Sequence, residues 1–218
     1  MIRLYRSPEP ALLTEKKDEW VNKFLTARQT TPTLRPQSSQ YGHAEIKNAL
    51  RAISFHKCFY CERKLSEQED EVEHYIEVAA RPELAFDWLN LYLACKDCNK
   101  RKRPSSEIPI TACVDPCNES DQPEAHLSFD AEMIRSMSNS QKGLKTIQKY
   151  CLDRDDLNLQ RLRRLHSFKD VLLEIRKRQI IETRTTLTEG EKEALLHFQQ
   201  PDQPFSLLFR CYLAKFDL

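Results

Sequence analysis

The chain has 218 residues, a length that suits one domain or one domain with a sizeable appendage. Its 34 lysines and arginines nearly balance its 33 aspartates and glutamates, so an attraction to nucleic acid would have to come from local clusters of charge. No apolar run follows MIRLYRSPEP and no stretch reaches the length that crosses a bilayer, which predicts a cytoplasmic protein with no membrane partner. In that reducing compartment the eight cysteines would be thiols, and paired thiols indicate a metal site before a disulfide.

The first quarter of the chain has the apolar spacing of helices. Leu13 and Phe24 lie on one face of a helix predicted over residues 10–28, and a second amphipathic helix is predicted over 43–56. A polar, proline-bearing linker, 30–42, separates the two. With three glycines in the whole chain, helices are favoured over tight β-turns.

The middle of the chain has the pattern of two short strands. Residues 72–76 alternate and are β-branched enough for one strand, and 91–94 is its expected partner. A helix is expected after Asn99, and the four prolines of 104–128 predict loop and extended chain there.

The rest of the chain is predicted to be helical. Asp153 is the expected N-cap of a long helix that ends near residue 186, with shorter helices before and after it. Its basic stripe, Arg161 included, is expected to face solvent or to pair with nearby acids.

Two CxxC pairs dominate the middle of the sequence. This spacing lets two thiolates bind one tetrahedral zinc ion from a tight turn, and two pairs complete the four ligands of a structural site. With four protein ligands such a zinc is closed to substrate. The 33 residues between the pairs exceed the length that a simple zinc ribbon needs, so a further element is inserted there. The predicted zinc ligands are Cys58, Cys61, Cys95 and Cys98.

The inserted element contains Glu73 and His74, then Asn90, and Asn99 follows the last zinc cysteine. In this order, between two zinc knuckles, the residues resemble those of the HNH nucleases, which have a ββα-metal fold. The resemblance covers about residues 58 to 103. It implies an α+β fold, mostly α-helical, in which an HNH core stapled by a four-cysteine zinc site is flanked by N- and C-terminal helices.

Phosphodiester hydrolysis explains why these residue types would be needed. A neutral imidazole can take a proton from water near pH 7, which makes His74 the candidate general base. Glu73 and Asn99 offer oxygen ligands suited to a catalytic Mg²⁺ or Mn²⁺. Asn90 is expected to tie the loop between the strands and so to keep His74 aimed. Taken singly, the four residues are better explained as an exposed histidine, a solvated charge, a turn former and a helix cap. Taken together between the two zinc knuckles, they favour the catalytic interpretation.

A basic run, KRKR, opens the helix after Asn99. Positive charge at a helix start opposes the helix dipole, which suggests that these residues serve another purpose. They are candidates for contacts to DNA phosphates, with a solvated basic face as the alternative. The run comprises Lys100, Arg101, Lys102 and Arg103.

The sequence signal for a second zinc site is weak, because its candidate ligands have no evident fourth partner. These candidates are Cys113, Cys117 and His126. Ordinary buried thiols are the simpler interpretation. The expected organisation is a helical segment at 1–56, an HNH core with its trailing loop at 57–128, and a helical region at 129–218.

A narrower resemblance extends over roughly two thirds of the chain. The stretches CFYCE, VEHYIEV, RPELAFDWLNLYLACKDCNKRK and GLKTIQKYCLDRDDLNLQRLRR are similar to those of the HNH subunit of bacterial Septu anti-phage defence systems (PtuB-like). The resemblance implies a DNA endonuclease that works with an ABC- or SMC-like ATPase subunit (PtuA-like). Alternatives are a stand-alone HNH restriction or homing-type nuclease, and a zinc-stapled nucleic-acid or protein adaptor without catalysis.

Overall fold

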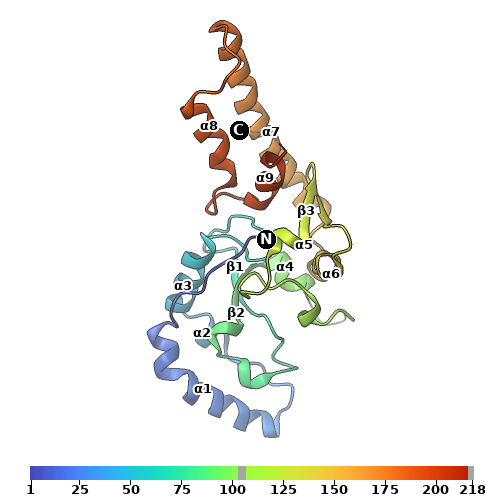
Figure 1. Cartoon of the computed structure of the whole chain (residues 1–218). Coiled ribbons are helices and arrows are strands. Elements are labelled where there is room, and N and C mark those ends of the chain that lie inside the picture. The colour runs from blue at the N-terminus through green and yellow to red at the C-terminus, as the bar shows by residue number, and fades with distance from the viewer. Residues whose placement is uncertain (103–106, 216–218) are drawn as a thin grey trace.

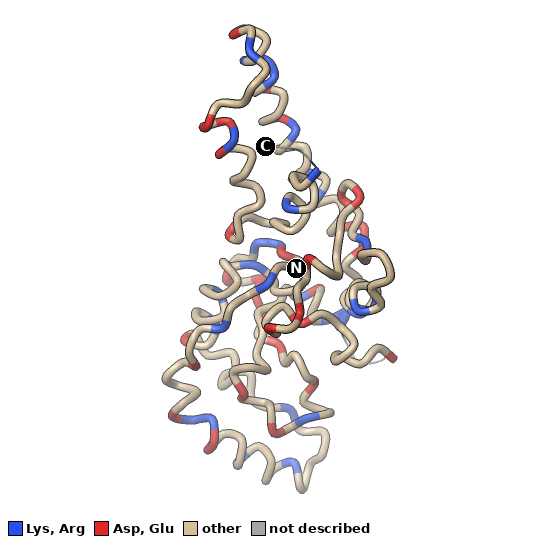
Figure 2. Tube along the Cα trace, viewed as in Figure 1, with Lys and Arg blue, Asp and Glu red and all other residues tan. Residues whose placement is uncertain are grey.

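The computed structural model describes residues 1–102 and 107–215, and it has a mostly helical α+β fold. Two small antiparallel sheets lie in the body of the molecule, and helices cover them (Figure 1). Acidic and basic residues are interspersed over the whole trace (Figure 2). Among the described helices, none is both long and apolar enough to cross a lipid bilayer. The predicted fold class is therefore confirmed.

The N-terminal helices form one side of the body. They are α1 (Ala11–Thr30), α2 (Ser38–Tyr41) and α3 (Ala44–Ser54). α3 is amphipathic and buries Ile46 and Leu50, while α1 buries Leu13 and Phe24. The ring of Phe24 lies edge-on to Phe86, with 6.2 Å between the centroids, so α1 covers the loop that follows the first strand.

The first sheet holds the centre of the molecule. β1 (Asp70–His74) pairs antiparallel with β2 (Leu91–Cys95), which is buried along its whole length. Short 3-10 helices at Pro82–Leu84 and Trp88–Asn90 occupy the connection. The helix α4 (Lys96–Arg101) follows β2 directly. β1 is thus shifted by two residues toward the N-terminus relative to the predicted strand 72–76. α4 begins three residues before Asn99, whereas the helix was expected to begin after it.

The second sheet is a hairpin that the sequence pattern did not predict. β3 (Leu127–Asp130) pairs with β4 (Met133–Ser136) through a two-residue turn. Such turns favour Asn-Gly, whereas here Ala131 takes the left-handed backbone conformation at φ 49°. The usual turn signal is absent, which explains why these strands were not found. Two short helices precede the hairpin, a 3-10 turn at Ile110–Ala112 and α5 (Pro123–His126).

The C-terminal helices include an arm that projects from the body (Figure 1). We use "the arm" for α7 (Asp155–Ile181), α8 (Glu189–Leu196) and the turn between them. α6 (Gln141–Tyr150) precedes the arm, and a 3-10 turn at His197–Gln199 and α9 (Ser206–Leu213) follow it. α7 ends five residues before the predicted end, and its N-cap is Arg154 instead of Asp153.

Arg161 contradicts the expectation that the basic stripe of α7 faces solvent. Its side chain is only 1 % exposed, and Nη1 donates to the carbonyl of Leu152 at 2.8 Å and to Oδ1 of Asn158 at 2.9 Å. The guanidinium therefore holds the turn between α6 and α7. Its helical position did not reveal this, because the face that packs inward depends on the fold around it.

A buried group of charges joins the central region to α9. The carboxylate of Glu62 accepts from Lys57 Nζ at 3.2 Å, from Ser206 Oγ at 2.6 Å and from the α-amino group of Met1 at 2.6 Å. Burial alone would raise the pKa of Glu62, but the charges of Met1 and Lys57 outweigh burial and hold the pKa well below its usual range. The ionised carboxylate is therefore part of the folded state.

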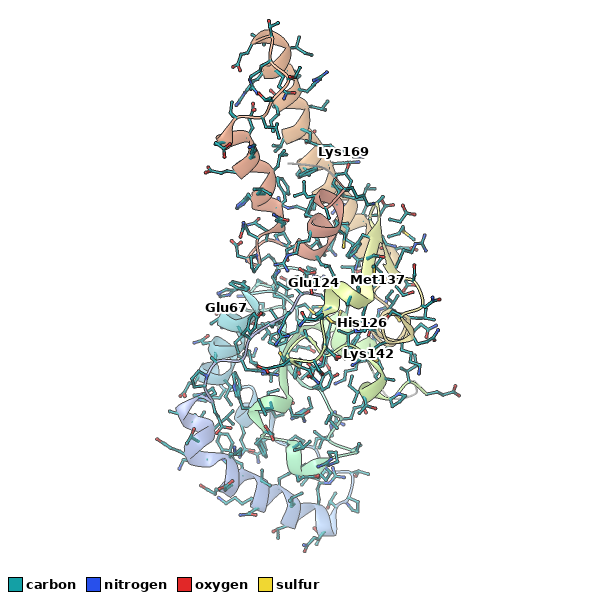
Figure 3. The ribbon with its side chains drawn as sticks, in the orientation of Figure 1. Glu67, Glu124, His126, Met137, Lys142 and Lys169 are labelled. Carbon is teal, nitrogen blue, oxygen red and sulfur yellow. The ribbon has the colours of Figure 1, made fainter. Side chains whose placement is uncertain are left out.

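We expect Glu62→Gln to lower the free energy of unfolding by about 3–5 kcal/mol, because it leaves the ammonium of Lys57 buried without its counter-charge. Glu67→Gln is the matched control, since Glu67 is exposed (Figure 3) and its carboxylate lies 3.5 Å from Arg51. We expect its effect to stay below about 1 kcal/mol. Urea unfolding at neutral pH measures both variants, and equal stabilities would contradict the role of Glu62.

The buried carboxylate of Glu62 also makes the free energy of unfolding depend on pH. Because the folded-state pKa of Glu62 is depressed, its contribution is full above the unfolded-chain value of about 4.3 and is lost as the pH falls below it. The free energy of unfolding of Glu62→Gln should therefore decline less between neutral pH and acid than that of the wild type.

Candidate functional site

The four predicted zinc cysteines form one buried cluster. Their sulfur atoms lie within 4.8 Å of one another, and Cys61 Sγ and Cys95 Sγ are 3.9 Å apart. Four sulfurs at the Zn–S distance of a tetrahedral site stand about 3.8 Å apart, so the cluster has the size that zinc needs. Cys95 is both the last residue of β2 and the N-cap of α4, where its Sγ accepts from Cys98 N at 3.4 Å. The candidate zinc site thus fixes the junction of strand and helix.

Two arginines give the cluster a positive surrounding. Arg154 Nη1 lies 3.6 Å from Cys98 Sγ, while Arg154 Nη2 and Arg63 Nε are buried with no hydrogen-bond partner in the described part of the chain. Burial would lower the pKa of Arg154, but the neighbouring cysteines raise it well above its usual range. Four thiolates around one Zn²⁺ carry a net charge of about −2, which two guanidinium groups offset. The donor set and its surroundings fit a structural zinc ion.

Strand β1 presents two different faces to its neighbours. Side chains alternate along a strand, so Glu71 and Glu73 share one face and His74 takes the other. The first face lies against α4: Asn99 Nδ2 donates to Glu71 Oε2 at 2.8 Å, and Lys102 Nζ donates to Glu73 Oε2 at 2.6 Å. The structure therefore brings two carboxylates, an amide and an ammonium together on one side of β1.

Glu73 is the buried member of this group. Its side chain also accepts a hydrogen bond from the hydroxyl of Tyr60, and the residue is 4 % exposed. Burial raises the pKa of Glu73, and the ammonium of Lys102 partly offsets the rise. Lys102 also donates to the backbone carbonyl of His74, so one side chain links the carboxylate to the residue that carries the imidazole.

The His74 imidazole is held at the end of β1. Its Nε2 lies 2.8 Å from the carbonyl of Ala85, which can only accept, so Nε2 carries the proton. No donor among the described residues binds Nδ1, whose lone pair faces none of them. Tyr41 packs edge-on against the ring, with 4.7 Å between the centroids. Burial lowers the pKa of His74 to about 4, although the bond to Ala85 opposes the shift. The imidazole is therefore neutral near pH 7 and able to accept a proton.

Asn90 ties the loop between the strands to the residues that follow His74. Its Oδ1 accepts from Ile76 N at 2.6 Å, and its Nδ2 donates to the carbonyls of Ile76 and Leu84 at 3.1 Å each. Leu84 precedes Ala85, whose carbonyl holds the imidazole. The amide of Asn90 thus fixes both the backbone next to His74 and the backbone of its hydrogen-bond partner.

The basic run divides into an engaged part and a free part. Lys102 is 3 % exposed and its ammonium is bound to Glu73, whereas Lys100 and Arg101 are exposed. Arg103 lies outside the described residues. Lys102 is buried because α4 crosses β1 at this point, which the sequence of the run alone does not reveal.

Two residues of this site were missed by the sequence analysis. Glu71 precedes Glu73 by two residues, and the period of a strand would have placed both on one face. Tyr41 comes from the linker before α3, and no local pattern connects it with His74.

Cys113 and Cys117 lie outside the cluster of zinc cysteines. Among the residues that the structure describes, the four zinc cysteines are the group whose ligand atoms converge. His126 is the last residue of α5 (Figure 3), and its Nδ1 is 2.8 Å from Ser140 Oγ. The interpretation of Cys113 as an ordinary buried thiol agrees with its 1 % exposure.

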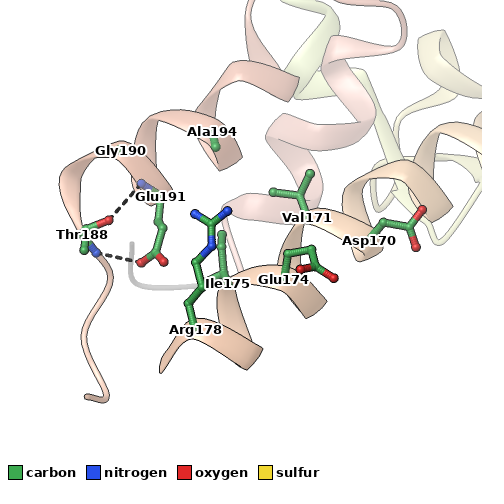
Figure 4. Close-up of a pocket in the computed structure, with 9 residues that line it drawn as sticks. All are labelled: Asp170, Val171, Glu174, Ile175, Arg178, Thr188, Gly190, Glu191 and Ala194. Carbon is green, nitrogen blue, oxygen red and sulfur yellow. Dashed lines mark hydrogen bonds between the residues drawn. The ribbon is translucent and has the colours of Figure 1, made fainter. Parts of the chain in front are cut away.

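A separate hollow of about 540 Å³ lies on the arm, between α7 and α8 (Figure 4). Val171, Ile175 and Ala194 give it an apolar floor, and Asp170, Glu174 and Arg178 stand at its sides. None of the predicted site residues lines it. The candidate site therefore lies on β1 and α4 and not on the arm.

We expect Cys95→Ser to release the structural metal and to lower the melting temperature, because the binding energy of a structural zinc is folding energy. Cys151→Ser is the matched control, since Cys151 is a half-buried thiol outside the cluster. Elemental analysis for zinc and thermal unfolding of both variants measure the effect. A Cys95→Ser protein that keeps its zinc and melts as the control does would contradict the assignment.

Comparisons with known proteins agree with this geometry. The HNH endonuclease family model matches residues 58–105, which contain the four zinc cysteines and the strands β1 and β2. Septu protein PtuB of Bacillus mycoides (strain KBAB4) is 28 % identical over 236 residues, covering 92 % of this chain and 76 % of the relative. Septu protein PtuB of Bacillus thuringiensis is 34 % identical over 114 residues, covering 50 % of this chain and 41 % of the relative. The chain thus contains an HNH endonuclease domain and is homologous to Septu PtuB over most of its length.

Proposed function

We propose that this protein is a metal-dependent DNA endonuclease and that His74 is its general base. The observation that carries the proposal is the state of the imidazole: it is neutral, its Nε2 proton is bound to the carbonyl of Ala85, and its Nδ1 has no hydrogen-bond partner among the described residues. A base with a free lone pair and a fixed ring can remove a proton from water at neutral pH.

The reaction follows from what each group can do. Nδ1 of His74 takes a proton from the attacking water, the water oxygen bonds to phosphorus, and the bond from phosphorus to the 3′ oxygen breaks. Asn90 keeps the ring aimed, because its amide holds the backbone on both sides of the bond between His74 and Ala85.

Glu73 and Asn99 would hold the catalytic Mg²⁺ or Mn²⁺ once the cation replaces Tyr60 and Lys102, which bind the two oxygens of Glu73 in this structure. Glu71 would orient Asn99 through their hydrogen bond. Carboxylate and amide oxygens on one face of β1 are the donor set that these hard cations prefer. When bound, such a cation stabilises negative charge on the phosphate and on the leaving oxygen. The four zinc cysteines take no part in the reaction, since a site with four protein ligands has no open position.

The biological setting is proposed from the relatives. Two relatives are named Septu protein PtuB, and one of them aligns with nearly the whole chain. We infer that the protein is the nuclease effector of a bacterial anti-phage defence system and acts in the cytoplasm with an ABC- or SMC-like ATPase (PtuA-like). In this arrangement 57–128 carries the chemistry, and the helical parts 1–56 and 129–218 support it and offer surface to the partner.

We expect His74→Ala to reduce Mg²⁺- or Mn²⁺-dependent nicking of plasmid DNA by at least about 100-fold, the usual contribution of a general base. His166→Ala is the matched control, because His166 is exposed on α7. Zinc content and melting temperature should stay unchanged in both variants. Undiminished nicking by His74→Ala would refute the assignment of the base, and a wild type that binds DNA without cutting it would favour the adaptor.

The partner is tested by co-purifying the protein with the product of its neighbouring gene. We expect a stable complex, and we expect its rate of DNA cleavage to differ between samples with and without ATP. Full cleavage by the isolated chain, with no complex and no effect of ATP, would favour a stand-alone nuclease.

A further inference from the structure

Another hollow, of about 480 Å³, lies where the base of the arm meets the turn that follows Cys61. Four of its nine lining residues are basic and one is acidic, so its wall has an excess of positive charge. None of the residues of the candidate nuclease site lines it. We call this space the basic hollow, and its charged lining residues are Arg63, Lys64, Glu69, Arg163 and Arg164.

The helix α7 contributes one polar face to the basic hollow. Its four lining residues occupy positions i, i+3, i+4 and i+7 of the helix, the spacing that places side chains on the same side. The face therefore brings two guanidinium groups, an amide and a hydroxyl to one space. These residues are Gln160, Arg163, Arg164 and Ser167.

Three of the four cations have no carboxylate partner in the described part of the chain. Lys64 Nζ donates to the carbonyl of Phe55 at 2.7 Å, and Arg164 Nη2 donates to Oε1 of Gln203 at 2.9 Å. Arg163 is exposed, and its guanidinium makes neither a hydrogen bond nor an ion pair with any described residue. Because neutral oxygens do not offset a charge, all three positive charges remain unneutralised.

The other two charges of the basic hollow have partners within the chain. Arg63 Nη1 lies 3.7 Å from Asp97 Oδ2, and the carboxylate of Glu69 accepts from the backbone N and the hydroxyl of Ser66 at 3.1 and 2.8 Å. Among the described residues, no ion pair joins Glu69 to a cation of the hollow. Cations that line one space repel each other, and an anion bound between them removes this repulsion.

The guanidinium of Arg164 is held in a fixed plane. It lies over the ring of Phe198, 4.4 Å from the centroid, and Gln203 binds its Nη2. Its Nε is buried and has no hydrogen-bond partner in the part of the chain that the structure describes. A guanidinium that is already fixed loses little conformational freedom when it binds an oxyanion.

We propose that the basic hollow binds phosphate groups of the DNA backbone. Phosphate supplies the negative charge that the unpaired cations lack, and a guanidinium can bind two of its oxygens at once. Lys64 follows the first zinc knuckle and Arg163 lies on α7, so bound DNA would contact the body and the arm together. The inference rests on the proposed nuclease function and adds to it a DNA contact outside the site on β1 and α4.

The test compares two full-length double variants, each of which removes two exposed positive charges. Lys64→Gln with Arg163→Gln alters the basic hollow. Lys23→Gln with Arg176→Gln is the matched control, because these residues lie on α1 and α7 and do not line the hollow. The affinity of each protein for a short DNA duplex is measured by fluorescence anisotropy at several salt concentrations, without added Mg²⁺ or Mn²⁺.

We expect the hollow variant to bind the duplex at least about tenfold more weakly than the control does. The slope of its log affinity against log salt should be smaller in magnitude by about 1.8, the value for two lost phosphate contacts. Arg163→Lys alone keeps the charge and should keep the slope, but it should lose part of the affinity because an ammonium binds phosphate as a point charge. Both double variants should melt as the wild type does, since the altered side chains are exposed.

Equal affinities and salt slopes in the hollow variant and the control would overturn the proposal. Calorimetric titration with ATP separates the sources of phosphate. If the hollow variant loses affinity for ATP but not for the duplex, the ligand is a free nucleotide and the assignment to DNA is wrong. A wild type that binds the duplex through the hollow but cuts no DNA under any metal condition would refute the nuclease function and uphold the DNA contact.

Discussion

The convergence of four thiols at the junction of β2 and α4 is the constraint on which the site depends. Cys58 and Cys61 come from the turn before the sheet, and Cys95 and Cys98 from the end of β2 and the start of α4. Bound to one ion, they fix the direction in which α4 leaves the sheet. That direction places Asn99 on Glu71 and Lys102 on Glu73.

The two faces of β1 bear different groups. On the α4 face, the carboxylates of Glu71 and Glu73 bind the amide of Asn99 and the ammonium of Lys102, and this ammonium limits the net charge that has to be buried. On the other face, the carbonyl of Ala85 and the ring of Tyr41 hold a neutral imidazole. Lys102 contacts both sides, because it binds Glu73 and the carbonyl of His74. A change in the angle of α4 would therefore shift the surroundings of Glu71 and Glu73 and the backbone of His74 together.

Local spacing made much of this site predictable, and contacts distant in sequence made the rest unpredictable. The CxxC pairs could be assigned as one cluster because two residues between cysteines allow one ion to be shared. Glu71 could have been added from the period of a strand. The burial of Lys102 and Arg161 could not be predicted from the sequence, since it depends on which neighbouring elements pack against these residues. The β3–β4 hairpin was not predicted because Ala131 occupies a turn position that usually carries asparagine or glycine.

X-ray absorption at the zinc edge of the purified full-length protein tests the central claim most directly. The account predicts a first shell of four sulfur atoms at about 2.3 Å. A shell that contains nitrogen or oxygen, or fewer than four sulfurs, would contradict it, because β2 and α4 would then be joined in some other way.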